Sequence, residues 1–302
     1  MIYIKLESCT GLIEEENFFK RKFIEFKTRI KRIREEKFDN ITIITLPNLE
    51  MYTLEKLERY IDVKCISRVC LSDSLICNSQ ILDFLKFKRI KIFDGRWLFK
   101  YLMIDCVEYI CNMKNERIDY QEISILSNKL DGALKQLIYE LTSKVRILNI
   151  VTDNEKIFKK MEKSLSEEKG FIININNNYK KSLSRSNIII NYNFSEEEIN
   201  KYNFPRKCAI LNLENKIKIT SKSFEGINVD FYEINIAKKY LRNSMFLKEF
   251  NTAILYESYI YKNTNPQNIR REILEDEISI LYLNGMNGRI RKNEYINLVK
   301  KS

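Results

Sequence analysis

The chain has 302 residues, 44% hydrophobic and 31% charged, so it can bury a sizeable core. Only 7 Gly and 3 Pro occur, which argues against a turn-rich β-sandwich and against a disordered chain. Histidine is absent, which excludes triads and zinc sites that use it, and we expect no metal site. The net charge of +11 is typical of proteins that bind nucleic acid or anionic lipid. A lysine-rich composition of this kind is also expected from an AT-rich bacterial genome, and we favour this explanation of the charge.

The seven cysteines are predicted to be reduced and mostly buried, because no C-x-x-C pair is present. No apolar run approaches the ~18 residues of a membrane span, so we expect no membrane-spanning segment. Lys5 and Glu7 interrupt the first apolar run, which argues against a signal peptide. We therefore expect a cytoplasmic protein.

The first 125 residues are predicted to form an α/β domain with a mostly parallel sheet. A basic amphipathic helix is expected near the start, because aromatic and isoleucine residues recur at helical spacing from Phe19 to Ile33. We interpret it as a core-packing helix with a solvated lysine face, the alternative being a phosphate or membrane contact. Strands and helices then alternate, which indicates a parallel sheet covered by helices: strands at 41–46, 65–71 and 90–93; helices at 54–60, 81–87 and 97–113.

Residues 126–240 are predicted to form a Rossmann-like domain. The pattern restarts with strands at 123–126, 145–151, 171–175, 188–190, 208–213 and 229–234, and with helices at 132–141 and 155–165. The tail, 241–302, is predicted to be helical over 252–261 and 269–283, after a further helix at 238–247 that spans its boundary. The fold class expected is therefore an α/β protein with a mostly parallel-sheet first domain, a Rossmann-like domain and a helical C-terminal segment.

Two short stretches carry a family resemblance. Leu130-Asp131-Gly132, with Asn128 nearby, is similar to an Asn-Thr-Asp-Gly motif, and Phe93 to Lys100 can be laid over an Asn-Val-Thr-x-Pro-x-Lys motif. Both motifs belong to the shikimate dehydrogenase superfamily, which includes the glutamyl-tRNA reductase type of dinucleotide domain. In that family C-terminal helices return to the first domain, so the resemblance implies that the C-terminal helices of this chain pack back on the first domain. The resemblance implies NAD(P)-dependent hydride transfer, with Lys100 and Asp131 handling the hydroxyl proton. The Thr and Pro of the lysine motif are absent, and the alternative roles are a solvated lysine and a helix cap.

The dinucleotide loop of that family is missing. Glycines would be expected after the strand at 147–151, where backbone N–H groups approach the pyrophosphate, but Thr152, Asp153 and Asn154 follow instead. Asp153 and Glu155 add negative charge, and two like charges ~4 Å apart repel by roughly 1–4 kcal/mol. We therefore expect no cofactor, with NAD(P) as the alternative.

Further binding candidates lie elsewhere in the chain. Arg96 starts a predicted helix and is suited to grip a carboxylate or phosphate, and Asn128 is a second ligand-binding candidate. The stretch from Gly285 to Arg291 is similar to the G-x-x-G loop of KH domains, which clamps a nucleic-acid backbone. Its cationic residues are Arg289, Arg291 and Lys292. The alternative is a helix C-cap followed by a turn.

Three functional hypotheses remain from the sequence. The favoured one is a non-catalytic Rossmann-like protein that binds a small molecule or a protein partner. The others are a dehydrogenase that uses Lys100 and Asp131, and a nucleic-acid-binding protein. The dehydrogenase hypothesis requires the two side chains to share a cleft and to lie within about 10 Å of each other.

Overall fold

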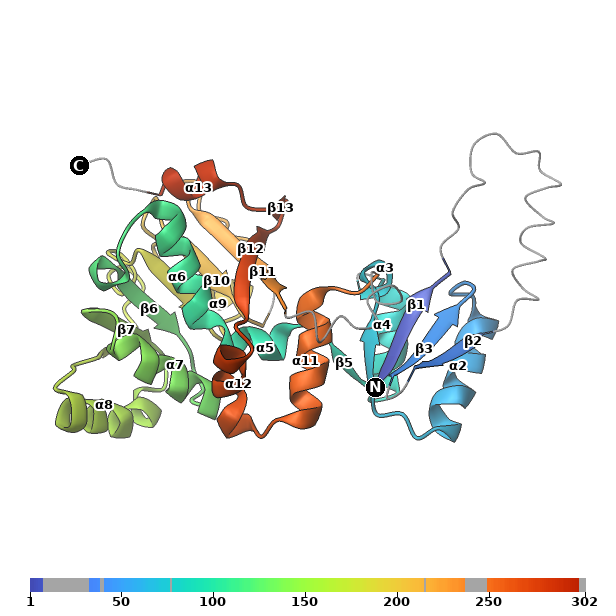
Figure 1. Cartoon of the computed structure of the whole chain (residues 1–302). Helices are drawn as coiled ribbons and strands as arrows, with labels where there is room; N and C mark the ends of the chain where they lie inside the picture. Colours follow the sequence, from blue (N-terminus) through green and yellow to red (C-terminus); the bar gives the residue numbers. More distant parts are fainter. Residues whose placement is uncertain (8–32, 39–40, 77, 215, 237–248, 299–302) are drawn as a thin grey trace. The chain divides into compact units, whose positions relative to one another are not determined.

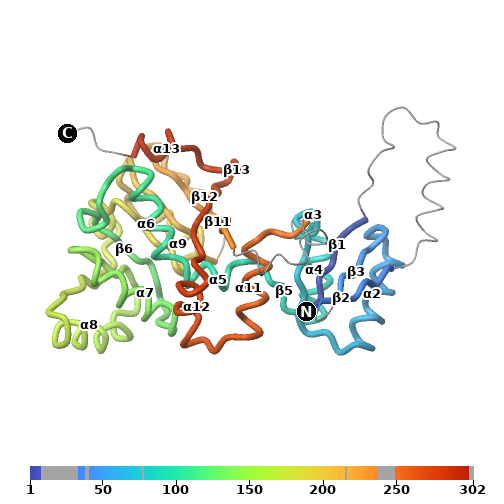
Figure 2. The backbone as a smooth tube through the Cα atoms, in the orientation of Figure 1, coloured from blue at the N-terminus to red at the C-terminus, as the bar shows by residue number. Residues whose placement is uncertain are grey.

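The structure is a computed structural model that describes residues 1–7, 33–38, 41–76, 78–214, 216–236 and 249–298. The chain forms two compact units, each built from two stretches of sequence (Figures 1 and 2). The first unit comprises Met1–Gly95 and Ala237–Asn263, and the second comprises Arg96–Ile236 and Thr264–Ser302. These boundaries differ from the expected divisions after residues 125 and 240. The reason is that helices just after Gly95 pack on elements of the second sheet, whereas a late helix joins the first sheet.

The first unit contains a five-stranded sheet in the order β2-β3-β1-β4-β5. All neighbouring strands are parallel except β2, which runs antiparallel to β3. The strands predicted at 41–46, 65–71 and 90–93 are present as β3 (Ile41–Leu46), β4 (Arg68–Leu71) and β5 (Lys91–Phe93), and the helices predicted at 54–60 and 81–87 are present as α2 (Met51–Val63) and α4 (Ser79–Phe87). The unit also contains β1 (Ile2–Leu6), β2 (Arg34–Phe38) and α3 (Asp73–Ile76). The predicted basic helix lies almost wholly outside the described residues, and Arg34 already belongs to β2.

Helix α11 (Thr252–Asn263) completes the first unit, which agrees with the prediction that C-terminal helical residues pack on the first sheet. It contacts β4 and β5. Ile254 and Leu255 pack with Tyr3 and Phe93 in one apolar cluster. The hydroxyl of Tyr3 also lies 2.9 Å from that of Ser258 on α11.

The second unit contains an eight-stranded sheet in the order β13-β12-β11-β10-β9-β6-β7-β8. Its first six strands along the chain run parallel: β6 (Glu122–Leu126), β7 (Ile147–Val151), β8 (Asn174–Asn176), β9 (Ile188–Asn191), β10 (Ala209–Asn212) and β11 (Ile227–Asn235). Counted from β6, their spatial order is 3-2-1-4-5-6, which is the Rossmann order. The Rossmann-like prediction is confirmed.

The helices of the second unit follow the predicted alternation with one break. The expected helix at 97–113 is two helices, α5 (Arg96–Tyr101) and α6 (Met103–Lys114), separated at the buried Leu102. The others are η1 (Ile118–Tyr120), α7 (Gly132–Thr142), α8 (Glu155–Lys169), α9 (Glu196–Ile199), η3 (Pro266–Asn268), α12 (Ile269–Glu275) and α13 (Lys292–Ile296).

The predicted helix at 269–283 is wrong beyond its first two turns. Helix α12 ends at Glu275, and Glu277 adopts a positive φ of 54°, which stops the helix. The chain then forms β12 (Ser279–Gly285), which pairs antiparallel with β11, and β13 (Gly288–Arg289), which pairs antiparallel with β12, and the two extend the sheet. A short apolar run reads equally well as helix or strand, and here the open edge of β11 provides backbone partners that favour the strand.

The cysteines and the membrane prediction can be checked in the described residues. Cys70, Cys106, Cys111 and Cys208 are buried as expected, whereas Cys65 is exposed. Burial raises the pKa of the Cys111 and Cys208 thiols to about 12, so both stay protonated at neutral pH. No helix in the described part of the chain is long and apolar enough to cross a membrane.

Candidate functional site

The candidate site lies where the strand order of the second sheet reverses. Strands β6 and β9 are neighbours, but the chain continues from β6 toward β7 on one side and from β9 toward β10 on the other. Doubly wound sheets bind ligands outside the carboxyl ends of the two strands at such a switch point. Here those ends are followed by the loop Ser127 to Asp131 after β6, and by Tyr192 and Asn193 after β9.

Asp131 is the hub of this site. It is the N-cap residue of α7, and its Oδ1 accepts a hydrogen bond of 2.8 Å from the backbone N–H of Leu134. The same oxygen accepts a 2.6 Å hydrogen bond from the hydroxyl of Tyr192, which ties the β6 loop to the end of β9. Asp131 therefore has the cap role that the sequence offered as one of two alternatives.

The structure also brings Lys100 to Asp131, as the resemblance implied. Lys100 lies in the last turn of α5, and its Nζ is 3.5 Å from Oδ2 of Asp131. It is also 3.7 Å from Oε1 of Glu214 and 5.0 Å from the ring centroid of Tyr192. The ammonium group thus faces two carboxylates and an aromatic ring, and its side chain is only 21% exposed.

Sequence reasoning missed Tyr192 and Glu214. Tyr192 directly follows β9 and Glu214 lies two residues beyond β10, so both stand at carboxyl ends of predicted parallel strands. The rule that ligands bind at those ends would have pointed to them. Their types gave no signal, because a lone tyrosine after a strand is usually a core residue.

Burial sets the protonation of the tyrosines in this site. It raises the pKa of Tyr192 well above its ordinary value, and the hydrogen bond to Asp131 raises it further. The pKa of Tyr101 is also raised, first by burial and then by the charge of Asp131. Both hydroxyls therefore remain neutral at physiological pH, and that of Tyr192 donates its hydrogen bond to Asp131.

A cavity of about 440 Å³ lies beside the Lys100–Asp131 pair. This volume falls in the range of about 300–1,000 Å³ that is typical of ligand pockets. Trp97 and Tyr101 contribute aromatic rings that meet edge to face, with 5.2 Å between their centroids. The full lining is Trp97, Lys100, Tyr101, Asp131, Gly132, Ala133, Gln136, Pro266 and Gln267.

The sheet order corrects the expected position of the phosphate-binding loop. In the Rossmann order this loop follows the first, central strand, which is β6 and not β7. The equivalent segment is therefore Ser127 to Gly132, while Thr152, Asp153 and Asn154 follow the second strand. The resemblance places the aspartate motif before the Rossmann strand, whereas Asp131 comes after it, so the motif and the fold are out of register.

The polar groups of the β6 loop are bound within the chain. The backbone N–H of Asn128 donates to Oδ1 of Asn193 at 2.9 Å. The side-chain oxygen of Asn128 accepts from the backbone N–H of Asp153 at 2.8 Å and from the hydroxyl of Thr152 at 3.2 Å. The hydroxyl of Thr152 in turn accepts from the N–H of Asn154 at 3.0 Å. Asparagine side chains thus hold the loops in place of a ligand.

The remaining predicted site residues lie elsewhere. Arg96 donates two hydrogen bonds of 3.0 Å to the carbonyl oxygens of Asn212 and Leu213, which fasten the end of β10 to the start of α5. Arg289 belongs to β13, Arg291 precedes α13 and Lys292 begins it, so these three are not among the residues that line the cavity. In the described residues, no group of three or more Cys, Asp or Glu side chains is arranged to hold a metal ion.

Comparisons with known proteins reach no further than the fold. No protein-family model and no curated protein matches the sequence. Among solved structures, the chain is similar to L-tryptophan dehydrogenase from Nostoc punctiforme, with 11% identity over 90% of this chain and 78% of that chain, and a TM-score of 0.35. It is also similar to a putative aspartate carbamoyltransferase from Trypanosoma cruzi (11% identity, 74% and 72% coverage, TM-score 0.29) and to malic enzyme from Pyrococcus horikoshii (11%, 91% and 81%, 0.26). The strand order defines a Rossmann-like α/β protein, and these neighbours say nothing about its activity.

Proposed function

We propose that the second unit is a non-catalytic binding module that holds a small organic molecule in the cavity beside Lys100 and Asp131, without a dinucleotide. The observation that carries this proposal is the position of the Asp131 carboxylate. It occupies the N-terminus of α7, the place at which a Rossmann helix receives the pyrophosphate.

The carboxylate of Asp131 substitutes for a bound phosphate. A helix N-terminus carries a partial positive charge and free N–H groups, and here the charge of Asp131 faces that end and its Oδ1 accepts from the N–H of Leu134. A phosphate at the same place would meet like charge at close range. The N–H of Asn128, which a pyrophosphate would also need, is engaged by Asn193.

The lining of the cavity indicates the class of ligand. Lys100 faces the carboxylates of Asp131 and Glu214, so its charge is compensated and the site carries no excess positive charge. Trp97 and Tyr101 offer aromatic faces, which attract apolar groups and organic cations. A neutral or amine-bearing organic molecule fits these groups better than an anion does.

The second candidate function is the NAD(P)-dependent oxidation of a hydroxy acid. It is supported by the 3.5 Å separation of Lys100 and Asp131, which lies well within the limit of about 10 Å set for a shared site. In that reading Lys100 and Asp131 would move the proton of the substrate hydroxyl, and a bound nicotinamide would supply the hydride acceptor. The internal bonding of the β6 loop disfavours it.

Trp97 makes the two functions distinguishable. It is the single tryptophan of the chain and it lines the cavity, so its fluorescence reports occupancy directly. We expect saturable changes with a panel of amines, amides and amino acids, and none with NAD(H) or NADP(H) at millimolar concentration. Gln136→Leu should weaken the response, whereas Tyr120→Ala, a change at an exposed tyrosine outside the cavity, should not.

Two results would contradict the proposal. Saturable energy transfer from Trp97 to NADH or NADPH would favour the dehydrogenase. A Trp97 signal that no member of the panel changes would remove the cavity as a binding site.

A further inference from the structure

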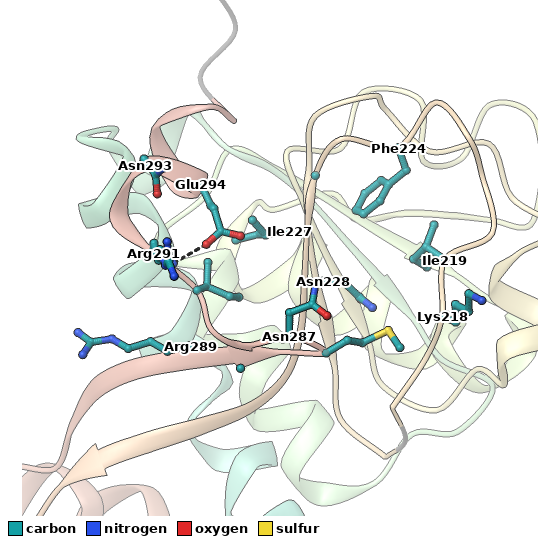
Figure 3. A pocket seen from close by; sticks show the side chains of 15 residues that line it. Lys218, Ile219, Phe224, Ile227, Asn228, Asn287, Arg289, Arg291, Asn293 and Glu294 are labelled. Atoms are coloured by element: carbon teal, nitrogen blue, oxygen red, sulfur yellow. Dashed lines mark hydrogen bonds between the residues drawn. The ribbon is translucent and has the colours of Figure 1, made fainter.

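A second concave surface lies at the opposite end of the second sheet. Parallel strand β11 begins there, and the turn between β12 and β13 lies beside its first residues. Figure 3 shows this basic groove, a hollow of about 640 Å³ between the β12–β13 turn and the segment from Lys218 to Phe224. It shares no lining residue with the cavity beside Lys100.

Two glycines shape the turn that forms one wall of the groove. A Cβ on Gly285 would lie 2.6 Å from the carbonyl oxygen of Asn228, so only glycine lets β12 approach the start of β11 this closely. Gly288 has a φ of 94°, in the region that side chains rarely adopt. The G-x-x-G pattern is therefore a turn between strands, neither the helix end nor the KH loop offered by the sequence.

Positive charge dominates the groove. Lys218, Arg289 and Arg291 line it, and none of them has an ion pair among the residues that the structure describes. The single acidic group is Glu294, whose Oε2 already accepts a 2.6 Å hydrogen bond from the backbone N–H of Arg291, the dashed line in Figure 3. The guanidinium of Arg289 lies 4.6 Å from the ring centroid of Tyr282, and in Figure 3 its side chain points away from Lys218 and Phe224, so Lys218 and Arg291 supply the positive charge of the groove. Against Glu294 they leave an excess of one positive charge, and Lys218 was not predicted from the sequence.

The groove also offers apolar contacts. Ile219 and Phe224 come from the loop that precedes β11 (Figure 3), and Met286, in the β12–β13 turn, also lines the groove. Met286 is 59% exposed, so its side chain is accessible to a ligand in the groove. An anion of purely ionic character would leave these groups unused.

We propose that the basic groove binds the phosphate of a nucleotide, with the base against Phe224 and Met286. Arginine and lysine side chains recognise phosphate oxygens, and apolar or aromatic side chains pack against the face of any base. The chain's net charge of +11 raises the local concentration of such an anion. The shared chemistry is a nucleotide phosphate, supplied either by a free nucleotide or by a single strand.

The test uses the full chain and three probes: a fluorescein-labelled oligothymidylate of about twelve nucleotides, adenosine monophosphate and inorganic phosphate. Fluorescence anisotropy should show binding of the oligomer that weakens with salt, with a slope of about −0.7 per phosphate contacted. Arg291→Gln and Lys218→Gln should each weaken binding about five- to tenfold and make that slope shallower.

Matched controls separate the groove from net charge. Arg271→Gln and Lys163→Gln remove the same charges from exposed sites outside the groove, and both should bind as the wild type does. Competition identifies the source: adenosine monophosphate displaces the oligomer at comparable concentration if the ligand is a free nucleotide, and only at much higher concentration if it is a strand. The proposal is overturned if neither the oligothymidylate nor adenosine monophosphate binds, or if inorganic phosphate competes as well as the nucleotide does. It is also overturned if the substitutions in the groove and the control substitutions weaken binding equally.

Discussion

Removing the Asp131 carboxylate tests whether the site is held together as described. In Asp131→Ala, helix α7 loses its cap, which costs about 1 kcal/mol, and the hydroxyl of Tyr192 loses its acceptor in a buried position, which costs about 1–3 kcal/mol. The contact with Lys100 adds little, because it is 3.5 Å long and Asp131 is 47% exposed. The second unit should therefore lose about 2–4 kcal/mol of unfolding free energy.

The same reasoning predicts a coupling between Asp131 and Tyr192. Tyr192→Phe alone should cost about 1 kcal/mol, and the double variant should cost about 1–2 kcal/mol less than the sum of the single changes. Asp131→Asn retains an oxygen that accepts both bonds and should cost less than Asp131→Ala. Asp153→Ala is the matched control, because only its backbone N–H is bonded to the site, and it should change stability by less than about 0.5 kcal/mol.

Urea unfolding followed by Trp97 fluorescence measures these changes in the right part of the molecule. Trp97 belongs to the second unit, so its signal reports that unit even if the two units unfold separately. Additivity within about 0.5 kcal/mol in the Asp131–Tyr192 cycle would refute the shared hydrogen bond.

Three further predictions concern the second unit. Arg270→Ala should cost about 3–5 kcal/mol in the same urea assay, because it strands the mostly buried carboxylate of Asp105, and Arg270→Lys should recover part of that loss. Asp230 has one buried oxygen without a hydrogen-bond partner among the described residues, and burial raises its pKa. Because the pKa is higher in the folded chain, ionisation of Asp230 destabilises the folded state as pH rises above 3.8, the ordinary pKa of the group. Asp230→Asn should therefore raise the free energy of unfolding by about 1–3 kcal/mol at pH 7. A gain in stability that does not shrink toward pH 4 would contradict this reasoning. Gly285→Ala should force β12 away from Asn228, lowering the melting temperature and weakening oligothymidylate binding together; unchanged binding would show that the groove does not depend on this contact.

The family resemblance pointed to Lys100 and Asp131, and the sequence pattern indicated the Rossmann order. The position of the phosphate-binding loop was wrong, because it was expected after β7 and lies after β6. The long apolar run at 147–151 reads more strongly as a first strand than the short run at 123–126 does. Which strand is central depends on pairing between β6 and β9, whose residues are more than 60 positions apart. Local pattern carries no such information, so the register of the fold against the motif stayed hidden.

The sequence did not predict the strands of the C-terminal tail or the lining of the groove, for a related reason. Residues 279–285 satisfy either period, and only the open edge of β11 decides between them. Lys218 lies in a loop with no motif of its own, so nothing in the sequence connects it with Arg289 and Arg291. Asn128 was predicted as a ligand-binding candidate, whereas its backbone N–H donates to the side chain of Asn193 and joins the two switch-point loops.

The alternating assembly of the two units has a consequence for synthesis on the ribosome. The chain leaves the first unit after Gly95 and returns to it only at Ala237, so α11 emerges long after the strands it covers. At ~5–20 residues per second, roughly 10–30 s separate the two events. During that interval the apolar face that includes Tyr3 and Phe93 is not yet covered by Ile254 and Leu255, while the ribosome synthesises the parallel strands of the second unit. We therefore expect chaperones to bind and cover this face of the nascent chain. A chain that stops before residue 252 would leave both units incomplete.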